Sequence, residues 1–273
     1  MNGDKVSFCL DYGEDNSNIN SVDINIKIIY EDDSLLLVDK PPFMPIHPTA
    51  YHQNDTLANG VKYYYDKIGL NKKIRPVNRL DRNTSGLVLF AKNEYIQELL
   101  IRQMATDSFR KKYLGLVHGN LENLLIDSYV KEICYNKNSF ISSKYNTIGK
   151  IEGIISAPIS RKENSIIERK IDKNGLSSKT NFKVIENYSD YSLLEFALET
   201  GRTHQIRVHT KFIGHPLLGD SLYGDSSTLI SRQALHSYFI SFIHPITGSL
   251  FEFTSGLPED MQNVINNLKN SNA

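Results

Sequence analysis

Cysteine is nearly absent from this chain of 273 residues. The two cysteines, Cys9 and Cys134, are too few for a disulfide framework and do not form a CxxC pair, so we expect a reducing compartment and no structural zinc. No apolar run approaches the roughly 18 residues needed to span a bilayer. Residues Met1–Asp15 contain four acids and one lysine, and they have no apolar run that could serve as a signal sequence. These absences predict a soluble, cytoplasmic protein.

The motifs of several common chemistries are also missing. The chain has no GxxxxGK[ST] or GxGxxG for phosphates, no GxSxG nucleophile elbow and no HExxH zinc motif. His204 and His209 are five residues apart, which separates their directions on a helix. We therefore interpret each as a structural or RNA-facing histidine rather than as a metal ligand, and we expect no metal.

Positive charge is concentrated in two segments although the chain is neutral overall. Thirty-one basic and thirty-one acidic residues cancel, which excludes a globally basic nucleic-acid binder. Residues 1–39 carry two lysines and nine acids, whereas residues 72–112 carry ten basic residues and four acids, and residues 201–219 carry three basic residues and no acid. Such segments suit phosphate binding, although charge runs also form ordinary solvated faces.

The hydrophobic patterns predict an α+β fold with a mixed, largely antiparallel sheet core and flanking helices. Expected strands outnumber helices, and many of the connections are too short for a crossover helix. We expect one large catalytic domain at 27–260, an acidic tail or linker at 1–26 and a polar C-terminal tail at 261–273. Expected helices begin at the N-caps Asp55, Asn93 and Thr203, and expected strands cover 24–30, 35–38, 86–91, 113–117, 182–184, 194–198, 238–243 and 250–253.

An aspartate among arginines is the first candidate for chemistry. Asp81 lies between Arg79 and Arg82, just before the apolar strand expected at 86–91. Nearby cations keep a carboxylate ionised, and a fixed, ionised carboxylate can act as a nucleophile or a general base. The alternative is that Asp81 only pairs with Arg79 or Arg82 at a surface turn.

Two further segments carry positive charge beside groups that could contact a ligand. If Thr203 caps a helix, then His204, Arg207 and Lys211 share one face, which would meet a phosphate or the carboxylate of Asp81. Tyr113 follows three cations, Arg110, Lys111 and Lys112, at the start of a strand. Tyr113 is either an ordinary aromatic at the core edge or a plane on which a base stacks, with a hydroxyl available for proton transfer.

These segments, taken in order, resemble the RluA-type pseudouridine synthase family. The likeness covers roughly residues 28 to 257, and its longest parts are Asn78-Arg-Leu-Asp-Arg-Asn-Thr-Ser-Gly-Leu-Val-Leu-Phe-Ala-Lys92, Lys112-Tyr-Leu-Gly-Leu-Val117, Gly201-Arg-Thr-His-Gln-Ile-Arg-Val-His209 and Gly214-His-Pro-Leu-Leu-Gly-Asp220. The resemblance implies isomerisation of uridine in RNA without a cofactor: the N1–C1′ bond breaks and the base rejoins through C5.

The resemblance also implies roles for individual residues. Asp81 matches the catalytic nucleophile or base, for which attack at the sugar and attack at the base both remain open. Tyr113 matches the active-site tyrosine that stacks on the target base, and Arg207 matches the arginine paired with the catalytic carboxylate. Arg79 matches the arginine that fills the space of the flipped nucleotide. We further expect RNA contacts from Arg82, Lys111, Lys112, Arg202, His204 and Lys211.

Two departures from the family pattern stand out. Asn78 occupies a position where the family usually has histidine, which could alter RNA contacts. Residues 1–26 are too few and too acidic for the S4 RNA-binding domain that many members carry, so at most its trailing end remains. The sequence identifies no oligomer, and a monomer is the default.

We therefore expect an RNA pseudouridine synthase, an isomerase that acts on ribosomal or transfer RNA, with large-subunit ribosomal RNA the first choice. The alternative is an RNA-binding ribosome-assembly factor on the same fold that does not need turnover. An acid in a basic cleft favours the enzyme, because it would repel the phosphates of RNA that is merely bound. A metal-dependent nuclease would need clustered carboxylates, which the sequence does not show.

Overall fold

The computed structural model describes residues 3, 13–106, 108–121, 140–145 and 151–271. Cys9, Cys134 and the first part of the expected N-terminal tail lie outside these residues. The helices are α1 (Leu57–Lys67), α2 (Glu94–Gln103), α3 (Gln205–Phe212) and α4 (Glu259–Ser271). The strands are β1 (Lys27–Glu31), β2 (Leu35–Lys40), β3 (Arg75–Pro76), β4 (Ser85–Ala91), β5 (Arg110–His118), β6 (Phe140–Tyr145), β7 (Ile151–Ser156), β8 (Ile159–Arg161), β9 (Arg169–Ile171), β10 (Lys179–Asn187), β11 (Tyr191–Leu198), β12 (Leu235–Ile243) and β13 (Leu250–Thr254).

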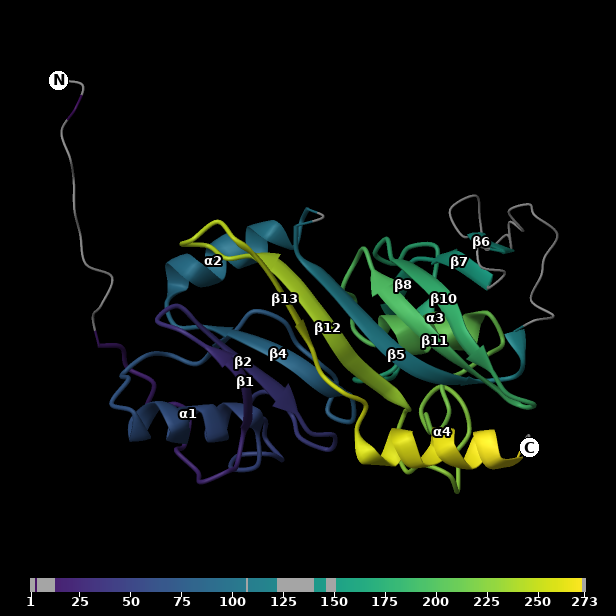
Figure 1. The fold of residues 1–273 in the computed structure, drawn as a ribbon, viewed down its shortest axis with the longest axis horizontal. Coiled ribbons are helices and arrows are strands. Elements are labelled where there is room, and N and C mark those ends of the chain that lie inside the picture. Colours follow the sequence, from purple (N-terminus) through teal and green to yellow (C-terminus); the bar gives the residue numbers. More distant parts are fainter. Residues whose placement is uncertain (1–2, 4–12, 107, 122–139, 146–150, 272–273) are drawn as a thin grey trace.

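One long sheet runs through the molecule (Figure 1). Its strand order is β1-β2-β4-β12-β5-β11-β10-β7-β6, with β3 added beside β4 and β13 beside β12. The pair β4–β12 is parallel, and the other pairs in the described chain are antiparallel. Strands β8 and β9 form a separate hairpin. The mixed, largely antiparallel sheet confirms the predicted fold class.

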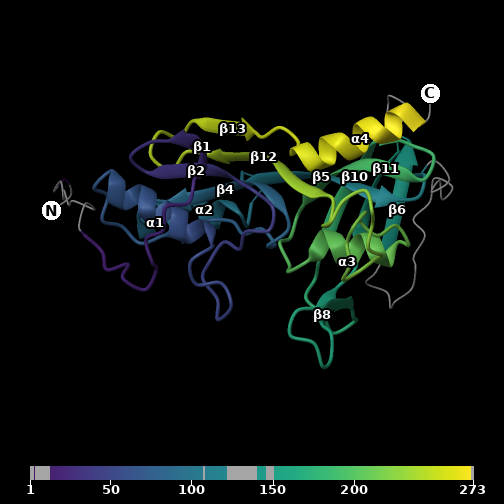
Figure 2. The same ribbon diagram turned by 90° about the horizontal axis from the view of Figure 1, so that it is seen from below.

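The helices cover both faces of this sheet because side chains alternate along each strand. In β2, Leu36 and Val38 pack under α1, whereas Leu35 and Leu37 pack on the other face with α2. The second half of the sheet consists of β5, β11, β10, β7 and β6. There α3 packs on the face of Tyr113 and α4 packs on the face of Leu116. Figure 2 shows α3 and α4 on opposite sides of the strands. Each half of the sheet is thus buried on both faces.

Part of the segment expected as an acidic tail or linker, residues 1–26, packs against the folded domain. Ile19 is 9% exposed and joins the apolar cluster beneath α1. The carboxylate of Glu14 receives two hydrogen bonds of 2.6 Å from the guanidinium of Arg75, which is itself buried. This segment packs because it supplies both an apolar side chain and the counter-charge for a buried arginine.

The residues expected as a polar C-terminal tail, 261–273, are helical up to residue 271. Residues from 259 onward form α4, which buries Met261, Val264 and Ile265 against the sheet. These residues recur at the spacing of one helix face, which the many polar residues between them obscured.

Two helix starts differ by one residue from those expected. Thr56 caps α1, accepting a hydrogen bond from the Asn59 amide, while the Asp55 carboxylate contacts the His52 ring instead. Helix α3 begins at Gln205, and its N-cap is His204 rather than Thr203. The predicted cap Asn93 of α2 is confirmed.

Candidate active site

A pocket of about 730 Å³ opens between the two halves of the sheet. This volume lies in the range typical of small-molecule and nucleotide sites. It is lined by the loop before β4, the end of α2, the start of β5 and the segment that leads into α3: Val77, Asn78, Arg79, Leu80, Asp81, Thr84, Ile101, Met104, Ala105, Phe109, Lys111, Tyr113, residues 198–207 and Leu235.

Asn78 fastens the loop that carries Asp81 to the edge of β4. Its side-chain amide donates to the Leu87 carbonyl (3.0 Å), and its side-chain oxygen accepts from the Leu89 amide (2.8 Å). Asn78 is only 3% exposed. The departure from the family pattern therefore falls on a side chain that holds the loop and also lines the pocket.

The other end of this loop is fixed where β4 meets β12. Gly86 has φ +114°, and a Cβ at this position would lie 2.2 Å from the Ser237 carbonyl oxygen. Only glycine permits this close approach. The fully buried Arg232 also donates to the Asn83 carbonyl (3.1 Å), so the loop is fixed from behind by a third contact.

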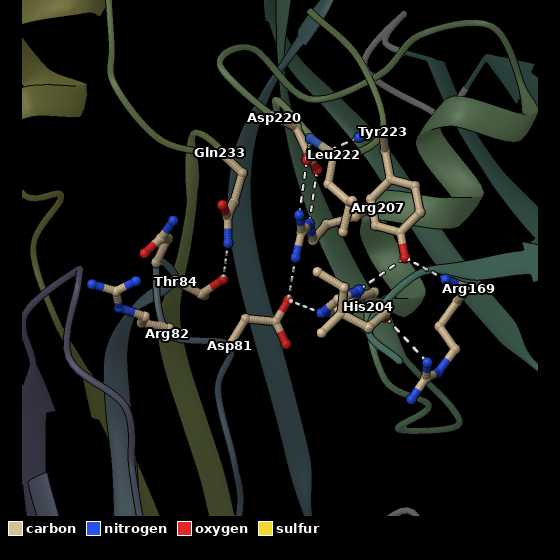
Figure 3. A network of polar contacts seen from close by, with 12 residues as sticks. Asp81, Arg82, Thr84, Arg169, His204, Arg207, Asp220, Leu222, Tyr223 and Gln233 are labelled. Atoms are coloured by element: carbon tan, nitrogen blue, oxygen red, sulfur yellow. Dashed lines mark hydrogen bonds and ion pairs between the residues drawn. The ribbon is translucent and has the colours of Figure 1, made fainter. Parts of the chain in front are cut away.

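Arg207 joins two carboxylates at the base of the pocket (Figure 3). Its Nη1 lies 3.1 Å from Oδ2 of Asp81, and its Nε and Nη2 each lie 2.8 Å from an oxygen of Asp220. The alternative in which Asp81 pairs with a neighbouring arginine is not what the structure shows. In the described part of the chain, Asp81 forms an ion pair with Arg207, and the ring of His204 also lies near its carboxylate.

Asp220 is the main residue of this site that sequence reasoning did not single out. It is 1% exposed and pairs in bidentate fashion with Arg207. Burial would lower the pKa of Arg207, but its contacts with Asp220 and Asp81 outweigh burial and raise the pKa further. The available signal was its place at the end of the stretch Gly214–Asp220, which was noted only as part of the family resemblance.

Tyr113 forms part of the pocket wall beside Asp81. Its ring packs in the core cluster with Ile206 and Leu235, and it is 5% exposed. Burial raises the pKa of the Tyr113 hydroxyl far above its ordinary value, and the charge of Asp81 adds to the shift. The hydroxyl is therefore protonated at neutral pH, which suits stacking and donation better than removal of a proton.

The structure divides the cations expected to bind RNA into two sets. Alternation along β5 places Lys111 in the pocket and turns Lys112 to the other side, where it pairs with Glu195 at 3.2 Å. Arg79, Lys111, Arg202 and His204 line the pocket, whereas Arg82, Lys112 and Lys211 do not. The Arg82 side chain instead donates to the Phe43 carbonyl (3.3 Å).

His204 faces Asp81 from the start of α3. Its Nε2 lies 3.8 Å from Oδ2 of Asp81, and its Nδ1 lies 2.8 Å from the Tyr223 hydroxyl. Burial lowers the pKa of His204, only partly offset by the charge of Asp81. Tyr223 also packs its ring against the guanidinium of Arg207, 4.9 Å from the ring centre, and sequence reasoning missed it.

Lys40 supports the same loop from β2. Its ammonium donates to the carbonyls of Pro41 (2.8 Å), Met44 (2.9 Å) and Arg82 (3.1 Å). Burial lowers the pKa of Lys40 to about 7. This lysine links the proline-rich loop after β2 to the loop of Asp81.

The arrangement combines a fixed carboxylate, an aromatic wall and a rim of cations in one open pocket. It can hold a planar base beside a reacting carboxylate while cations at the rim meet an anionic backbone. Among the described residues, no three histidine, cysteine, aspartate or glutamate side chains gather as metal ligands would. The helices in that part of the chain are too short or too polar to cross a membrane.

Comparisons with known proteins agree on one family. Residues 34–212 match the family model described as RNA pseudouridylate synthase. Among curated relatives, an uncharacterized RNA pseudouridine synthase of Bacillus subtilis is 38% identical over 90% of this chain, and ribosomal large subunit pseudouridine synthase D of Buchnera aphidicola is 33% identical over 90%. The chain spans 74% of the length of each. The solved structure of human RNA pseudouridylate synthase domain containing 4 is 17% identical with a TM-score of 0.62, covers 89% of this chain and 93% of its own, and shows a shared fold.

Proposed function

The chain belongs to the RNA pseudouridylate synthase family and is an isomerase that acts on RNA, and from this premise we propose that it converts uridines of large-subunit ribosomal RNA to pseudouridine, with Asp81 as the reacting group and no cofactor. The observation that carries the proposal is the carboxylate of Asp81, held by Arg207 at 3.1 Å inside a pocket walled by Tyr113.

The choice of ribosomal RNA rests on the relatives. The name of the Buchnera relative specifies the large ribosomal subunit. The pocket itself selects a nucleotide and does not distinguish one RNA from another, because the discriminating contacts lie along the RNA outside the target base.

The reaction balances without any added reactant. The N1–C1′ bond of uridine breaks, a C5–C1′ bond forms, the hydrogen on C5 leaves to solvent and N1 takes up a proton. No net oxidation or reduction occurs, so side chains alone can carry the sequence of steps. The carboxylate of Asp81, held by Arg207, is suited to attack either C1′ of the sugar or the uracil ring, so it is central to both routes.

A uridine in a duplex must leave its stack before Asp81 can reach it. Extrusion of a base costs a few kcal/mol. Arg79 is exposed at the rim of the pocket, where its planar guanidinium can replace the lost stacking as an ammonium cannot. Tyr113, inside the pocket, is placed to meet the face of the extruded base.

Asp81→Asn tests the proposal directly. The amide cannot act as nucleophile or base, so we expect the single-turnover rate of tritium release from [5-³H]uridine-labelled ribosomal RNA to fall by at least ~10³. The RNA should come from a strain lacking this gene, so that its target uridines are unmodified. Retention of RNA on filters should stay within about twofold of wild type, because Asp81 adds no phosphate contact.

A matched control is Asp33→Asn, which removes one carboxylate from the exposed turn between β1 and β2. Its rate should equal that of the wild type. Turnover retained in Asp81→Asn would transfer the reacting role to another group. Binding without tritium release by the wild type would favour an assembly factor that does not need turnover.

A further inference from the structure

The hydrogen bonds around Tyr223 fix the direction in which its proton points. The backbone amide of Arg169 in β9 can only donate, and it donates to the Tyr223 hydroxyl oxygen at 2.8 Å. The same oxygen lies 2.8 Å from Nδ1 of His204. Tyr223 is 3% exposed, so its own hydrogen needs a protein acceptor. The arrangement that satisfies every group has the hydroxyl donating to Nδ1 of His204.

That direction determines which ring nitrogen of His204 carries a proton. Nδ1 is an acceptor, so in the neutral ring the hydrogen is on Nε2. Nε2 faces Oδ2 of Asp81 at 3.8 Å. The ring thus presents a donor to the carboxylate without adding a full charge, in agreement with burial, which lowers the pKa of His204.

The backbone and the neighbouring ring hold His204 in this orientation. His204 has φ 58° and ψ 20°, in the left-handed region, at the first position before α3. Its ring packs edge-to-face against the Tyr223 ring, with centres 5.5 Å apart and planes at 79°. The charged groups around it are Asp81, Arg207, Arg169 and Asp220.

The two oxygens of Asp81 consequently lie in different environments. Oδ2 accepts a hydrogen bond from Arg207 at 3.1 Å and faces His204, whereas Oδ1 has no hydrogen-bond partner within the described chain. A carboxylate held through one oxygen presents the other to the pocket.

We propose that Tyr223 and His204 are positioning residues: Tyr223 fixes His204 with its Nε2–H directed at Oδ2 of Asp81, the oxygen to which Arg207 is hydrogen-bonded, and Oδ1 is left as the oxygen that reacts with uridine. The inference rests on the proposed function for its rate consequences, but its protonation claim stands on the structure alone. Because the Arg169 amide belongs to the β8–β9 hairpin, placement of this hairpin is also coupled to the reacting carboxylate.

The protonation state can be measured without turnover. Long-range ¹H–¹⁵N spectra of protein labelled with ring-¹⁵N histidine distinguish an unprotonated from a protonated nitrogen, and the His204 signals are those lost in His204→Asn. We expect Nδ1 unprotonated and Nε2 protonated in the wild type at pH 7.5. Tyr223→Phe should shift these signals, whereas Tyr188→Phe should not, because that buried hydroxyl bonds to Glu186 away from the site.

The rate measurement separates positioning from folding. Asn adopts left-handed backbone readily, so His204→Asn keeps the local fold and removes the donor that faces Asp81. We expect His204→Asn and Tyr223→Phe each to slow single-turnover isomerisation at saturating RNA at least about tenfold, as loss of positioning does. Tyr223 does not line the pocket, so Tyr223→Phe should do this at unchanged RNA affinity. His204→Gln, whose amide nitrogen can replace Nε2, should recover part of the rate lost in His204→Asn.

Two results would overturn the inference: a proton on Nδ1 of His204 in the wild type, or a Tyr223→Phe variant with wild-type ring signals and wild-type rate. If the wild type isomerises no RNA, the proposed function fails, while the spectra still decide whether the Tyr223–His204 arrangement is as described.

Discussion

Arg207 illustrates how much of the site depends on one planar side chain. It contacts Asp81 through one nitrogen and Asp220 through two others, so it positions the carboxylate of Asp81 relative to a fully buried one. An ammonium is a point charge and cannot span both partners.

Arg207→Lys should therefore abolish most activity although the charge is kept. We expect the isomerisation rate to fall about 100-fold, since displacement of a reacting group by about 1 Å has that effect. Urea unfolding should show a loss of about 2–3 kcal/mol, because Asp220 keeps only part of its buried pairing. Arg102→Lys on the exposed face of α2 is the control, and equal behaviour of the two variants would contradict the role given to Arg207.

His209 should make the stability of the protein depend on pH. It is fully buried between Thr180 and the Ala157 carbonyl, and burial lowers its pKa to about 4. Its ordinary pKa is about 6.5, so in this window the unfolded chain binds a proton that the folded protein does not. The stabilisation is complete above pH 6.5 and is lost as pH falls through 6.5 toward 4.

We expect the free energy of unfolding of the wild type to drop by about 2 kcal/mol more than that of His209→Gln between pH 7.5 and pH 5. Urea titrations of both proteins at the two pH values measure this difference. The variant removes one titrating group and keeps the others, so parallel losses in the two proteins would show that His209 is not the cause.

Among individual site residues, those that lie within a continuous sequence motif could be identified from the sequence. Asp81 and Arg207, expected to pair, lie 3.1 Å apart. Asp220 and Tyr223 were not singled out, because their importance comes from contacts with Arg207 and His204 that only the tertiary fold creates. Residue spacing along the chain carries no information about such contacts.

Among the elements, α4 is far from the pocket but is connected through Arg232 to the loop that carries Asp81. Asp260, in its first turn, accepts two hydrogen bonds from Arg232, and Arg232 donates in turn to the Asn83 carbonyl. Arg232 is fully buried, so it depends on Asp260 for its counter-charge.

Asp260→Ala should destabilise the protein by about 2–3 kcal/mol, because it leaves a buried guanidinium without its partner. Glu259→Ala removes the neighbouring acid of the same helical turn and should cost less than about 1 kcal/mol. Thermal and urea unfolding of the two variants compare these losses. Equal losses would mean that Asp260 acts only through the helix dipole.

Many of the elements were predictable, whereas the helix starts of α1 and α3, helix α4 and the strands β3 and β6–β9 were not placed correctly from the sequence. Strand β4 was evident because every one of its residues is buried, and β10 and β11 because they alternate. Helix α4 was missed because its apolar residues are separated by asparagine and glutamine, which lower the mean hydropathy without changing the apolar face. Periodicity was the better guide there than polarity.

For the molecule as a whole, positive charge at the pocket rim should make RNA binding depend on salt. Each cation that contacts a phosphate contributes about one unit to the slope of log affinity against log salt. Arg202 is exposed at the rim, whereas Lys112 is paired with Glu195 outside the pocket.

Arg202→Gln should therefore reduce this slope by about 1, and Lys112→Gln should leave it unchanged. Filter binding of ribosomal RNA at several salt concentrations gives both slopes. A slope lowered by Lys112→Gln to the same extent would place the RNA over the other side of β5.

The order of strands in the sheet could not be predicted from the sequence. Local patterns identify β4, β5 and β12 individually, but they do not show that β12, about 120 residues after β5, lies between the other two. Pairing over such distances depends on the whole chain.

The position of β12 between β4 and β5 has a consequence for how the chain folds as it is synthesised. Strands β4 and β5 leave the ribosome early, yet each faces β12 along one edge. Until β12 arrives, both edges are open in the middle of the nascent sheet, where they can pair with each other or with another chain. Late docking of β12 is therefore the step at which the loop of Asp81 and the strand of Tyr113 first take their relative positions, and the step at which a chaperone would protect the chain most.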